Sequence, residues 1–269
     1  MPAEAGERAA PMLSEGGGGG VPLVSLRGVS KAFKSGTIAL ENVDLDIRDG
    51  ELLTLLGPSG CGKSTVLRIV AGLTGSNSGE VKWRGQPSLG FVFQEPTLAP
   101  WSNVFDNVWL PMRLKGVSRS EAKQRVAEAL ASVGLTGFEK AYPRELSGGM
   151  KMRVSIARAL VLKPALLLMD EPFAALDEIT RAKLNDDLLK LRAQSGATIV
   201  FVTHSVYESV YLSTRIAVMG ARPGRVVAEI EVDPLAHRDE DFRLSKYYAE
   251  RAREASAALH LAMGGAPCA

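Results

Sequence analysis

A glycine-rich octapeptide, Gly57-Pro58-Ser59-Gly60-Cys61-Gly62-Lys63-Ser64, constrains the fold of this chain more than any other segment. Glycines at such spacing let backbone N–H groups turn inward toward phosphate oxygens, and a helix that follows presents its positive N-terminus to them. The compact apolar run Glu51–Leu56 precedes the loop, and Thr65–Leu73 has helical spacing after it. This order of strand, loop and helix favours a phosphate-binding loop over a chance glycine-rich turn.

The chemistry expected at this loop is ATP hydrolysis with magnesium. Lys63 is expected to reach the β- and γ-phosphates, and Ser64 to ligate Mg²⁺. The apolar run 166–169 leads directly into two carboxylates, Asp170 and Glu171, at the end of a predicted buried strand. Asp170 is expected to complete the metal shell, and Glu171 to polarise the attacking water as a general base. The alternative is that Asp170-Glu171-Pro172 only caps a strand.

Hydrophobic periodicity predicts an α/β fold. Alternating apolar residues at 24–29 and 43–47 predict antiparallel strands, and the short apolar runs 165–169 and 197–202 predict strands of a sheet covered on both faces. Helices are expected at 104–114 and 118–133, the second with Ser118 as N-cap and Glu121 completing a capping box. The predicted fold class is therefore a phosphate-loop NTPase core with a mixed sheet, an antiparallel β subdomain and a helical insertion.

The chain is expected to divide into three parts. Residues 1–20, which end in five glycines, predict a flexible leader. Residues 21–235 form the ATPase domain, with a helical subdomain at about 95–150, and 236–269 form a C-terminal helical extension. After the last core strand we expect a helix at 206–212, strands at 216–219 and 226–232, and one charged helix from about Asp239 to Leu261.

Composition and charge exclude several classes of function. The formal net charge is only +2, from 32 basic and 30 acidic residues. The chain therefore has no large positive electrostatic potential that would indicate nucleic acid as a partner. The longest apolar stretch, 157–169, is interrupted by charges and a proline, which excludes a spanning helix there. Cys61 and Cys268 are the two cysteines, too few for a disulfide framework. We expect a reducing, cytoplasmic compartment.

A second motif identifies a family. The segment Leu146-Ser147-Gly148-Gly149-Met150, followed by Arg153, resembles the signature motif of ATP-binding cassette (ABC) proteins. Other cassette elements follow in the family's order from about Val24 to Val232: an adenine-stacking aromatic, Phe33; the Q-loop Gln94; the D-loop Ala175-Leu176-Asp177; and the switch His204. A single Phe or His is more commonly a structural residue. The resemblance to the family therefore depends on all of these motifs occurring together in the family's order.

The resemblance implies a head-to-tail dimer of two copies, in which Ser147 and Gly149 of one cassette close over the γ-phosphate bound by Lys63 of the other. It implies catalytic roles for Lys63, Gln94, Glu171 and His204, and a metal shell from Ser64, Gln94 and Asp170. The residues it places at the nucleotide are Phe33, Gly57, Pro58, Ser59, Gly60, Cys61, Gly62, Lys63, Ser64, Thr65, Ser147, Gly149 and Asp177.

Three strings resemble importer cassettes of the nitrate, sulfonate and taurine group, which includes pyrimidine-precursor importers: 93–101, 203–208 and 219–225. This resemblance implies separate membrane permease subunits, an indirect solute-binding protein and a place on the cytoplasmic face of the membrane. Arg144-Glu145 falls where such cassettes contact the permease, or is an ordinary exposed pair. Lys151-Met152 and Thr214 depart from the group's usual residues. The transported solute stays open.

Two other functions compete with transport. A soluble ABC ATPase of translation or DNA repair usually has two cassettes or a long coiled-coil insertion, and this chain has neither. A non-enzymatic nucleotide-binding regulator is expected to lack Glu171 or His204, and both are present. Transport is therefore the favoured function. Cys61 is most simply a small residue that fills the loop. The alternative is a reactive thiol, because a helix N-terminus can lower the pKa of a thiol; maleimide should then block the loop, and bound ATP should protect it.

Overall fold

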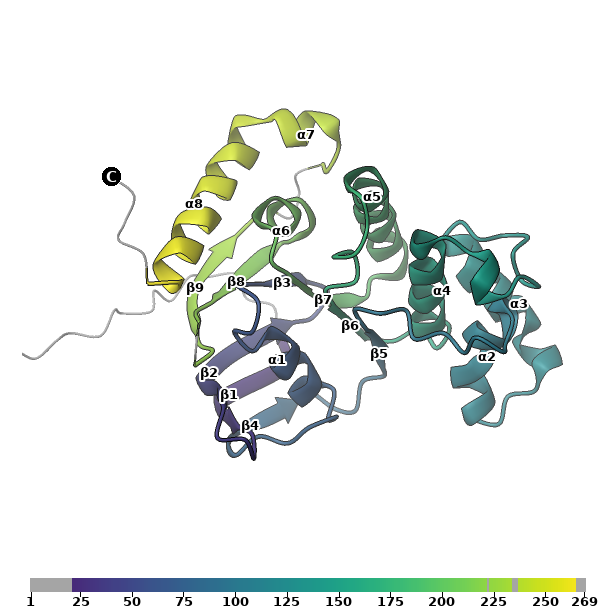
Figure 1. Cartoon of the computed structure of the whole chain (residues 1–269), viewed down its shortest axis with the longest axis horizontal. Helices are drawn as coiled ribbons and strands as arrows, with labels where there is room; N and C mark the ends of the chain where they lie inside the picture. The colour runs from purple at the N-terminus through teal and green to yellow at the C-terminus, as the bar shows by residue number, and fades with distance from the viewer. Residues whose placement is uncertain (1–20, 222, 234–236, 265–269) are drawn as a thin grey trace, which may run out of the picture.

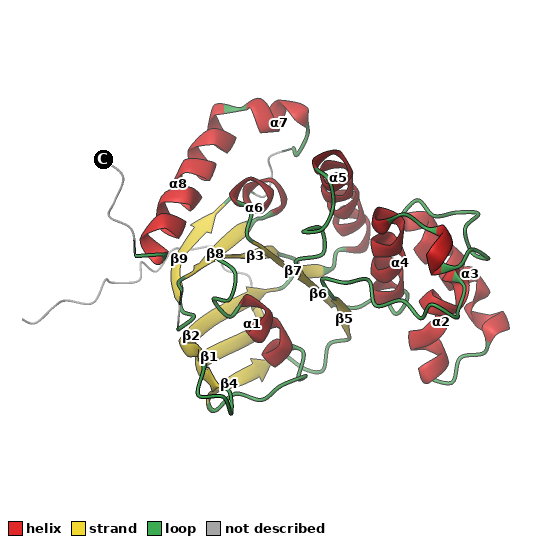
Figure 2. Ribbon diagram, in the orientation of Figure 1, coloured by secondary structure: helices red, strands yellow, loops and turns green. Residues whose placement is uncertain are grey.

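The structure, a computed structural model, describes residues 21–221, 223–233 and 237–264. The expected leader, residues 1–20, and Cys268 lie outside the described residues. Two sheets and a set of helices make up the described part (Figures 1 and 2). The arrangement confirms the predicted fold class, an α/β core with a mixed sheet, a separate antiparallel sheet and a helical insertion.

The larger sheet has six strands and carries the residues of the site. In spatial order they are β5 (Leu89–Val92), β6 (Leu166–Asp170), β7 (Thr198–Thr203), β3 (Leu52–Leu56), β8 (Arg215–Met219) and β9 (Val226–Glu231). Neighbouring strands pair in parallel, except that β9 runs antiparallel to β8. Every residue of β3, β6 and β7 is buried, because helices or the second sheet cover both faces. This explains their continuous apolar sequences.

The smaller sheet is antiparallel, in the order β2 (Ile38–Arg48), β1 (Pro22–Ala32) and β4 (Ser78–Trp83). The helix that follows the phosphate loop, α1 (Lys63–Val70), lies between the two sheets (Figure 2). Its side chains Val66, Leu67, Ile69 and Val70 share one apolar core with inward residues of β1, β2, β3 and β6. Burial from both sides therefore fixes the helix that begins at the proposed phosphate site.

The helical insertion lies at one end of the molecule, beyond β5 and β6 in Figure 1. It contains α2 (Val104–Leu114), α3 (Arg119–Ser132), the short 3₁₀ helix η1 (Pro143–Glu145) and α4 (Gly148–Leu160), and its three α-helices pack on one another. Ser118 caps α3 through the predicted capping box with Glu121. Ser147 is the N-cap of α4 and accepts a hydrogen bond from the Met150 N–H.

Four further helices belong to the second half of the chain: α5 (Glu178–Ser195), α6 (Val206–Leu212), α7 (Glu240–Leu244) and α8 (Lys246–Ala262). The short helix α7 packs on α8. The expectation of one continuous charged helix from Asp239 to Leu261 is wrong. Ser245 has extended backbone, with φ −71° and ψ 149°, and its hydroxyl accepts from the Tyr248 N–H to begin α8. This local side-chain cap competes with helix continuation and divides the segment in two.

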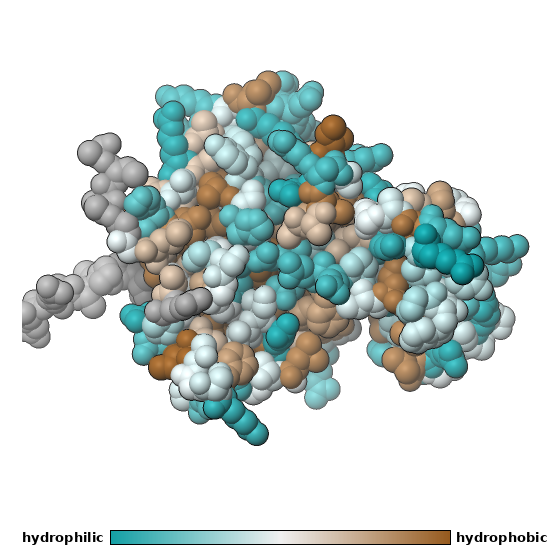
Figure 3. Space-filling model, viewed as in Figure 1, coloured by the Kyte–Doolittle hydropathy of each residue, from teal (hydrophilic) through white to brown (hydrophobic). Residues whose placement is uncertain are grey.

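Within the described residues, no helix has the length and apolarity to cross a lipid bilayer. The face of the molecule in Figure 3 shows hydrophilic and hydrophobic residues interspersed. The α8 helix lies against the β8–β9 edge and α6, and buries Ala252 and Ala255 there. The small side chains on that face let the helix approach the sheet closely.

Candidate nucleotide-binding site

The loop from Gly57 to Gly62 joins β3 to α1 and requires glycine at two positions for different reasons. Gly62 has φ +97°, a left-handed conformation, and a Cβ there would lie 2.7 Å from the Ala39 carbonyl oxygen. At Gly57, a Cβ would lie 2.7 Å from Cys61 Sγ and 2.9 Å from the Met219 carbonyl oxygen. The loop is therefore held tightly against β2 and β8, and its N–H groups are fixed in position.

Lys63 lies inside this loop and is 3% exposed. Its Nζ donates to the carbonyl oxygens of Gly57, at 2.7 Å, and Pro58, at 2.9 Å. The same nitrogen lies 3.5 Å from Glu171 Oε1. A buried ammonium with three oxygen neighbours supplies a positive charge at the entrance of α1, where phosphate is expected.

Ser64 and Asp170, which lie far apart in the sequence, meet directly. Ser64 Oγ donates to Asp170 Oδ1 at 2.7 Å. Burial raises the pKa of the Asp170 carboxyl, while Ser64, Arg68 and Lys63 act to lower it. A hydroxyl and a carboxylate side by side are oxygen ligands of the kind that Mg²⁺ takes when substrate phosphates complete its shell. The donor set therefore fits the expected metal.

Glu171 and His204 come together at the carboxyl ends of two adjacent strands. Because β6 and β7 are parallel, with Asp170 opposite Val202, the residues that follow each strand face one another. His204 Nδ1 lies 3.2 Å from Glu171 Oε2. Glu171 has φ +45°, an uncommon conformation for a residue with a side chain, and strain of this kind clusters at functional sites.

The remaining expected residues lie around this centre. Gln94 is exposed and follows β5, whose end pairs with the end of β6, so it stands beside the Asp170 edge of the sheet. Phe33 is 44% exposed and lies just after β1, in the connection to the strand whose Ala39 and Leu40 pack on Gly62. The expected roles of Phe33 at adenine and of Gln94 at Mg²⁺ stay predictions.

Ser147, Gly149 and Asp177 form a second group. Gly149 is buried against Thr180, since a Cβ there would lie 2.9 Å from Thr180 Cγ2. Asp177, the N-cap of α5, accepts from the Thr180 N–H, and this bond lowers the pKa of its carboxyl. Figure 1 shows α4, which begins after Ser147, on the far side of β5 and β6 from α1. Within one chain, the signature and the phosphate loop thus form separate groups.

The surroundings of Cys61 favour a loop-filling residue over a reactive thiol. The thiol is 1% exposed, and burial, the largest effect, raises its pKa although Lys63 acts in the opposite direction. The side chain points against Gly57 and away from solvent, because the loop closes over it. A thiol that is buried and protonated is a poor nucleophile.

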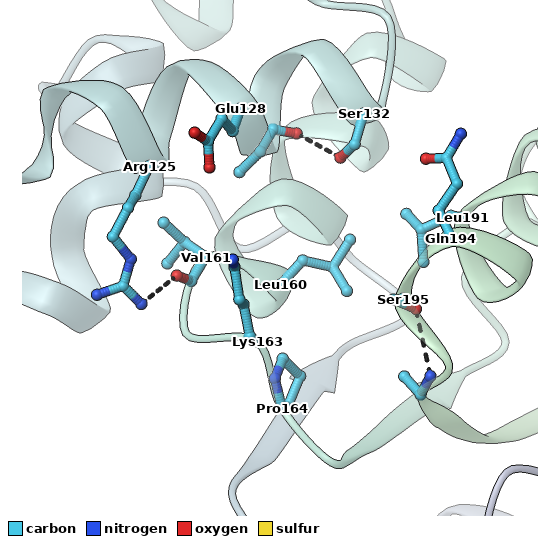
Figure 4. A pocket seen from close by; sticks show the side chains of 12 residues that line it. Arg125, Glu128, Ser132, Leu160, Val161, Lys163, Pro164, Leu191, Gln194 and Ser195 are labelled. Atoms are coloured by element: carbon cyan, nitrogen blue, oxygen red, sulfur yellow. Dashed lines mark hydrogen bonds between the residues drawn. The ribbon is translucent and has the colours of Figure 1, made fainter.

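A different pocket, of about 400 Å³, lies among α3, the end of α4 and the end of α5 (Figure 4). Its polar groups mostly bond within the protein: Arg125 donates to the Val161 carbonyl, and Ser132 to the Ala129 carbonyl. None of the expected nucleotide residues lines it. Its contacts stabilise the helical end and point to no nucleotide chemistry.

Sequence reasoning missed several residues that shape the centre. Gly224, between β8 and β9, packs so closely that a Cβ there would lie 2.1 Å from the Cys61 carbonyl oxygen. Thr203 and Glu208, on either side of His204, bond to each other inside the protein. Their positions next to a candidate catalytic histidine were a usable signal, whereas the contact of Gly224 depends on tertiary structure alone.

Comparison with known proteins agrees with this geometry. The family model described as "ABC transporter" matches residues 40–174. The chain is 48% identical to the aliphatic sulfonates import ATP-binding protein SsuB 1 of Pseudomonas syringae pv. syringae, over 81% of this chain and 89% of that protein. It is 47% identical to an uncharacterized ABC transporter ATP-binding protein of Methanocaldococcus jannaschii, over 75% and 78%.

Solved structures give the same result. One is an ATP-binding cassette described as dimeric, in a post-hydrolysis state bound to ADP and Pi, with 35% identity and a TM-score of 0.70 over 79% of this chain and 100% of that one. Another is cbiO1 of Clostridium perfringens, described as part of an ABC transporter complex, with 28% identity and a TM-score of 0.71 over 78% and 88%. The phosphate loop, the strand-end carboxylates and these matches show that the chain belongs to the ABC transporter family, as an ATP-binding and ATP-hydrolysing subunit.

Proposed function

We propose that this ATPase powers a membrane importer for a small solute, and that two copies of the chain share each catalytic site. The observation that carries the catalytic part is the convergence of Lys63, Ser64, Asp170, Glu171 and His204 at the carboxyl ends of β3, β6 and β7. Positioned charges of this kind are what phosphoryl transfer needs, since its barrier is lowered mainly by orientation and charge stabilisation.

Each residue has a role in this proposal. Lys63 holds the β- and γ-phosphates, and Glu171 accepts a proton from the attacking water. His204 contacts the γ-phosphate and keeps Glu171 in register. Ser64, Asp170 and Gln94 would hold Mg²⁺, which supplies positive charge to the phosphate oxygens when bound. The Phe33 ring stacks on adenine, and the loop residues listed from the sequence contact the phosphates.

A second copy supplies the missing part of each site. Ser147 and Gly149 lie with Asp177 and apart from α1 in one chain, so a partner must bring its own signature to the phosphate loop. A solved relative described as dimeric, with 35% identity to this chain, supports this arrangement. We propose a head-to-tail dimer in which the signature of each copy closes over the nucleotide of the other.

The importer role is supported by relatives named for aliphatic sulfonate import in Pseudomonas and Bacillus species. We propose that the chain acts at the cytoplasmic face of the membrane through separate permease subunits, with a solute-binding protein delivering the solute. Aliphatic sulfonates are the first solutes to test. Nitrate, taurine and pyrimidine precursors are the alternatives that the group resemblance includes.

Two measurements test this function. For catalysis, Glu171→Gln should bind ATP as wild type does while steady-state turnover falls at least about 100-fold, because the base is lost but the shape is kept. For transport, cells lacking the gene should lose uptake of one labelled solute of the group, and wild type but not Glu171→Gln should restore it. Full ATPase activity in Glu171→Gln contradicts the catalytic proposal, and unchanged uptake of all four solute types contradicts the importer proposal.

A further inference from the structure

A buried carboxylate lies one helical turn beyond His204 and has no part in the proposed chemistry. Glu208, on α6, is 8% exposed. Its Oε2 accepts a short hydrogen bond from Thr203 Oγ1, and the Thr203 side chain is itself buried. The Ser205 N–H donates to the same Thr203 oxygen at 3.0 Å. The Thr203 hydroxyl, just before His204, therefore bonds to the backbone just after His204, and Glu208 orients that hydroxyl.

The helix does not need this carboxylate for its own start. The hydroxyl of Ser205 already caps α6 by accepting from the Glu208 N–H at 3.3 Å. Burial raises the pKa of Glu208, while the bond from Thr203 and the charge of Arg181 lower it. Burying a carboxylate costs free energy unless the group is hydrogen-bonded. A buried Glu208 this close to a candidate catalytic residue therefore suggests that it has a function.

His204 needs such support because its own side chain is poorly held. The imidazole is 53% exposed, and its Nδ1 lies 3.2 Å from Glu171 Oε2. An exposed ring with one long contact keeps its direction only if the backbone that carries it is fixed. Glu208, Thr203, Arg181, Glu171 and His204 line one small pocket, so the support and the supported groups are adjacent.

We propose that Thr203 and Glu208 are a positioning pair, which fixes the backbone at 203–205 so that His204 faces Glu171 and the γ-phosphate. The pair acts through the hydrogen bond and does not touch substrate. This inference rests on the proposed role of His204 in hydrolysis. It concerns two residues to which neither the sequence motifs nor the comparisons assign a function.

The test compares variants that break the bond with variants that keep it. Thr203→Val removes the hydroxyl at nearly constant volume, and Glu208→Ala removes the acceptor; each should lower kcat about tenfold with little change in ATP affinity. Thr203→Ser and Glu208→Gln retain a donor and an acceptor, so both should keep most of the activity. Ser209→Ala is the matched control: it removes a partly buried hydrogen bond from the same helix, to the Val206 carbonyl, and should leave kcat unchanged.

A double-mutant cycle with His204→Ala separates this inference from the proposed function. If the pair acts through His204, Thr203→Val should cause no further loss in the His204→Ala background. An equal loss of kcat from Thr203→Val in the wild-type and His204→Ala backgrounds would overturn the positioning pair. So would a kcat of Thr203→Val and of Glu208→Ala that equals the kcat of Ser209→Ala. Wild-type turnover in His204→Ala alone would instead overturn the proposed role of the histidine. Thermal unfolding of each variant shows that the protein is folded in the assay.

Discussion

At the scale of single residues, Asp170 is held in a place that disfavours its charge. Burial raises its pKa above the ordinary value of 3.8, although Ser64 donates to it. Asp170→Asn should therefore stabilise the protein by about 1 kcal/mol when nucleotide and metal are absent, because an amide oxygen can accept from Ser64 without carrying charge. ATPase activity should nevertheless fall at least about 100-fold. Thermal unfolding and steady-state ATPase assays measure the two effects.

The stabilisation should depend on pH in a defined direction. Because the folded protein raises the pKa of Asp170, it binds this proton more tightly than the unfolded chain, and wild-type stability is lost as pH rises through the folded-state pKa. The advantage of Asp170→Asn over wild type should thus be largest at neutral pH and shrink as pH falls toward 3.8. An advantage that is constant with pH, or a less stable variant at neutral pH, would contradict the account.

Cys61 gives a second prediction at this scale. Since the thiol is buried and its pKa is raised, maleimide should modify it much more slowly in the folded protein than in denaturant, even without ATP. The measurement is the labelling rate by mass spectrometry in a Cys268→Ser background, so that only one thiol reacts. Labelling in the folded protein as fast as in the denatured chain would show that the loop opens readily.

Local chemistry explains which residues the sequence could predict. The positions of Lys63 and Ser64 follow from the loop motif, and Asp170 and Glu171 follow from a buried run that ends in two acids. The state of Cys61 could not be predicted in this way, because its side chain lies in an apolar core with residues of β1, β2 and β8, which are distant in the sequence. A pKa depends on the tertiary surroundings more than on neighbours in the sequence.

At the scale of elements, strong periodicity predicted most of the core. The strands 52–56, 166–170 and 198–203 were anticipated within one residue, because burial on both faces leaves an apolar run. The predictions did not include β4, β5, α4 or α5. β4 lies at a sheet edge and is largely exposed, β5 has four residues, and the buried positions of α5 are sparse among its charged ones. Such segments are defined by their partners in the fold.

The turn between β8 and β9 provides a test of how elements shape the phosphate loop. A Cβ on Gly224 would lie 2.1 Å from the Cys61 carbonyl oxygen and 2.8 Å from that of Ala39. Gly224→Ala should displace the loop, weaken ATP binding several-fold and destabilise the protein by about 1–3 kcal/mol. Gly75→Ala is the control, because a Cβ there meets no atom within 4 Å. Equal ATP affinity and unfolding temperature in the two variants would show that this packing is unimportant for the loop.

At the scale of the whole molecule, the two halves of the proposed shared site lie on different parts of the described chain. The phosphate loop and strand-end carboxylates lie beside α1, while the signature begins α4 in the helical insertion (Figure 1). The order of motifs along the sequence predicts both halves, but their separation is a property of the folded chain. It is the reason that a second copy is required by the proposed function.

The most direct test of this account uses two tandem-linked dimers that each carry Glu171→Gln and Ser147→Arg. With the mutations on different copies, one shared site has two intact halves and the other has both defects. With both on one copy, each shared site has one defect. The measurement is the ATPase rate, with linked wild type as the reference and permease present to favour closure. We predict substantial activity for the first arrangement and far less for the second; equal rates, or the reverse order, would contradict a site shared between copies.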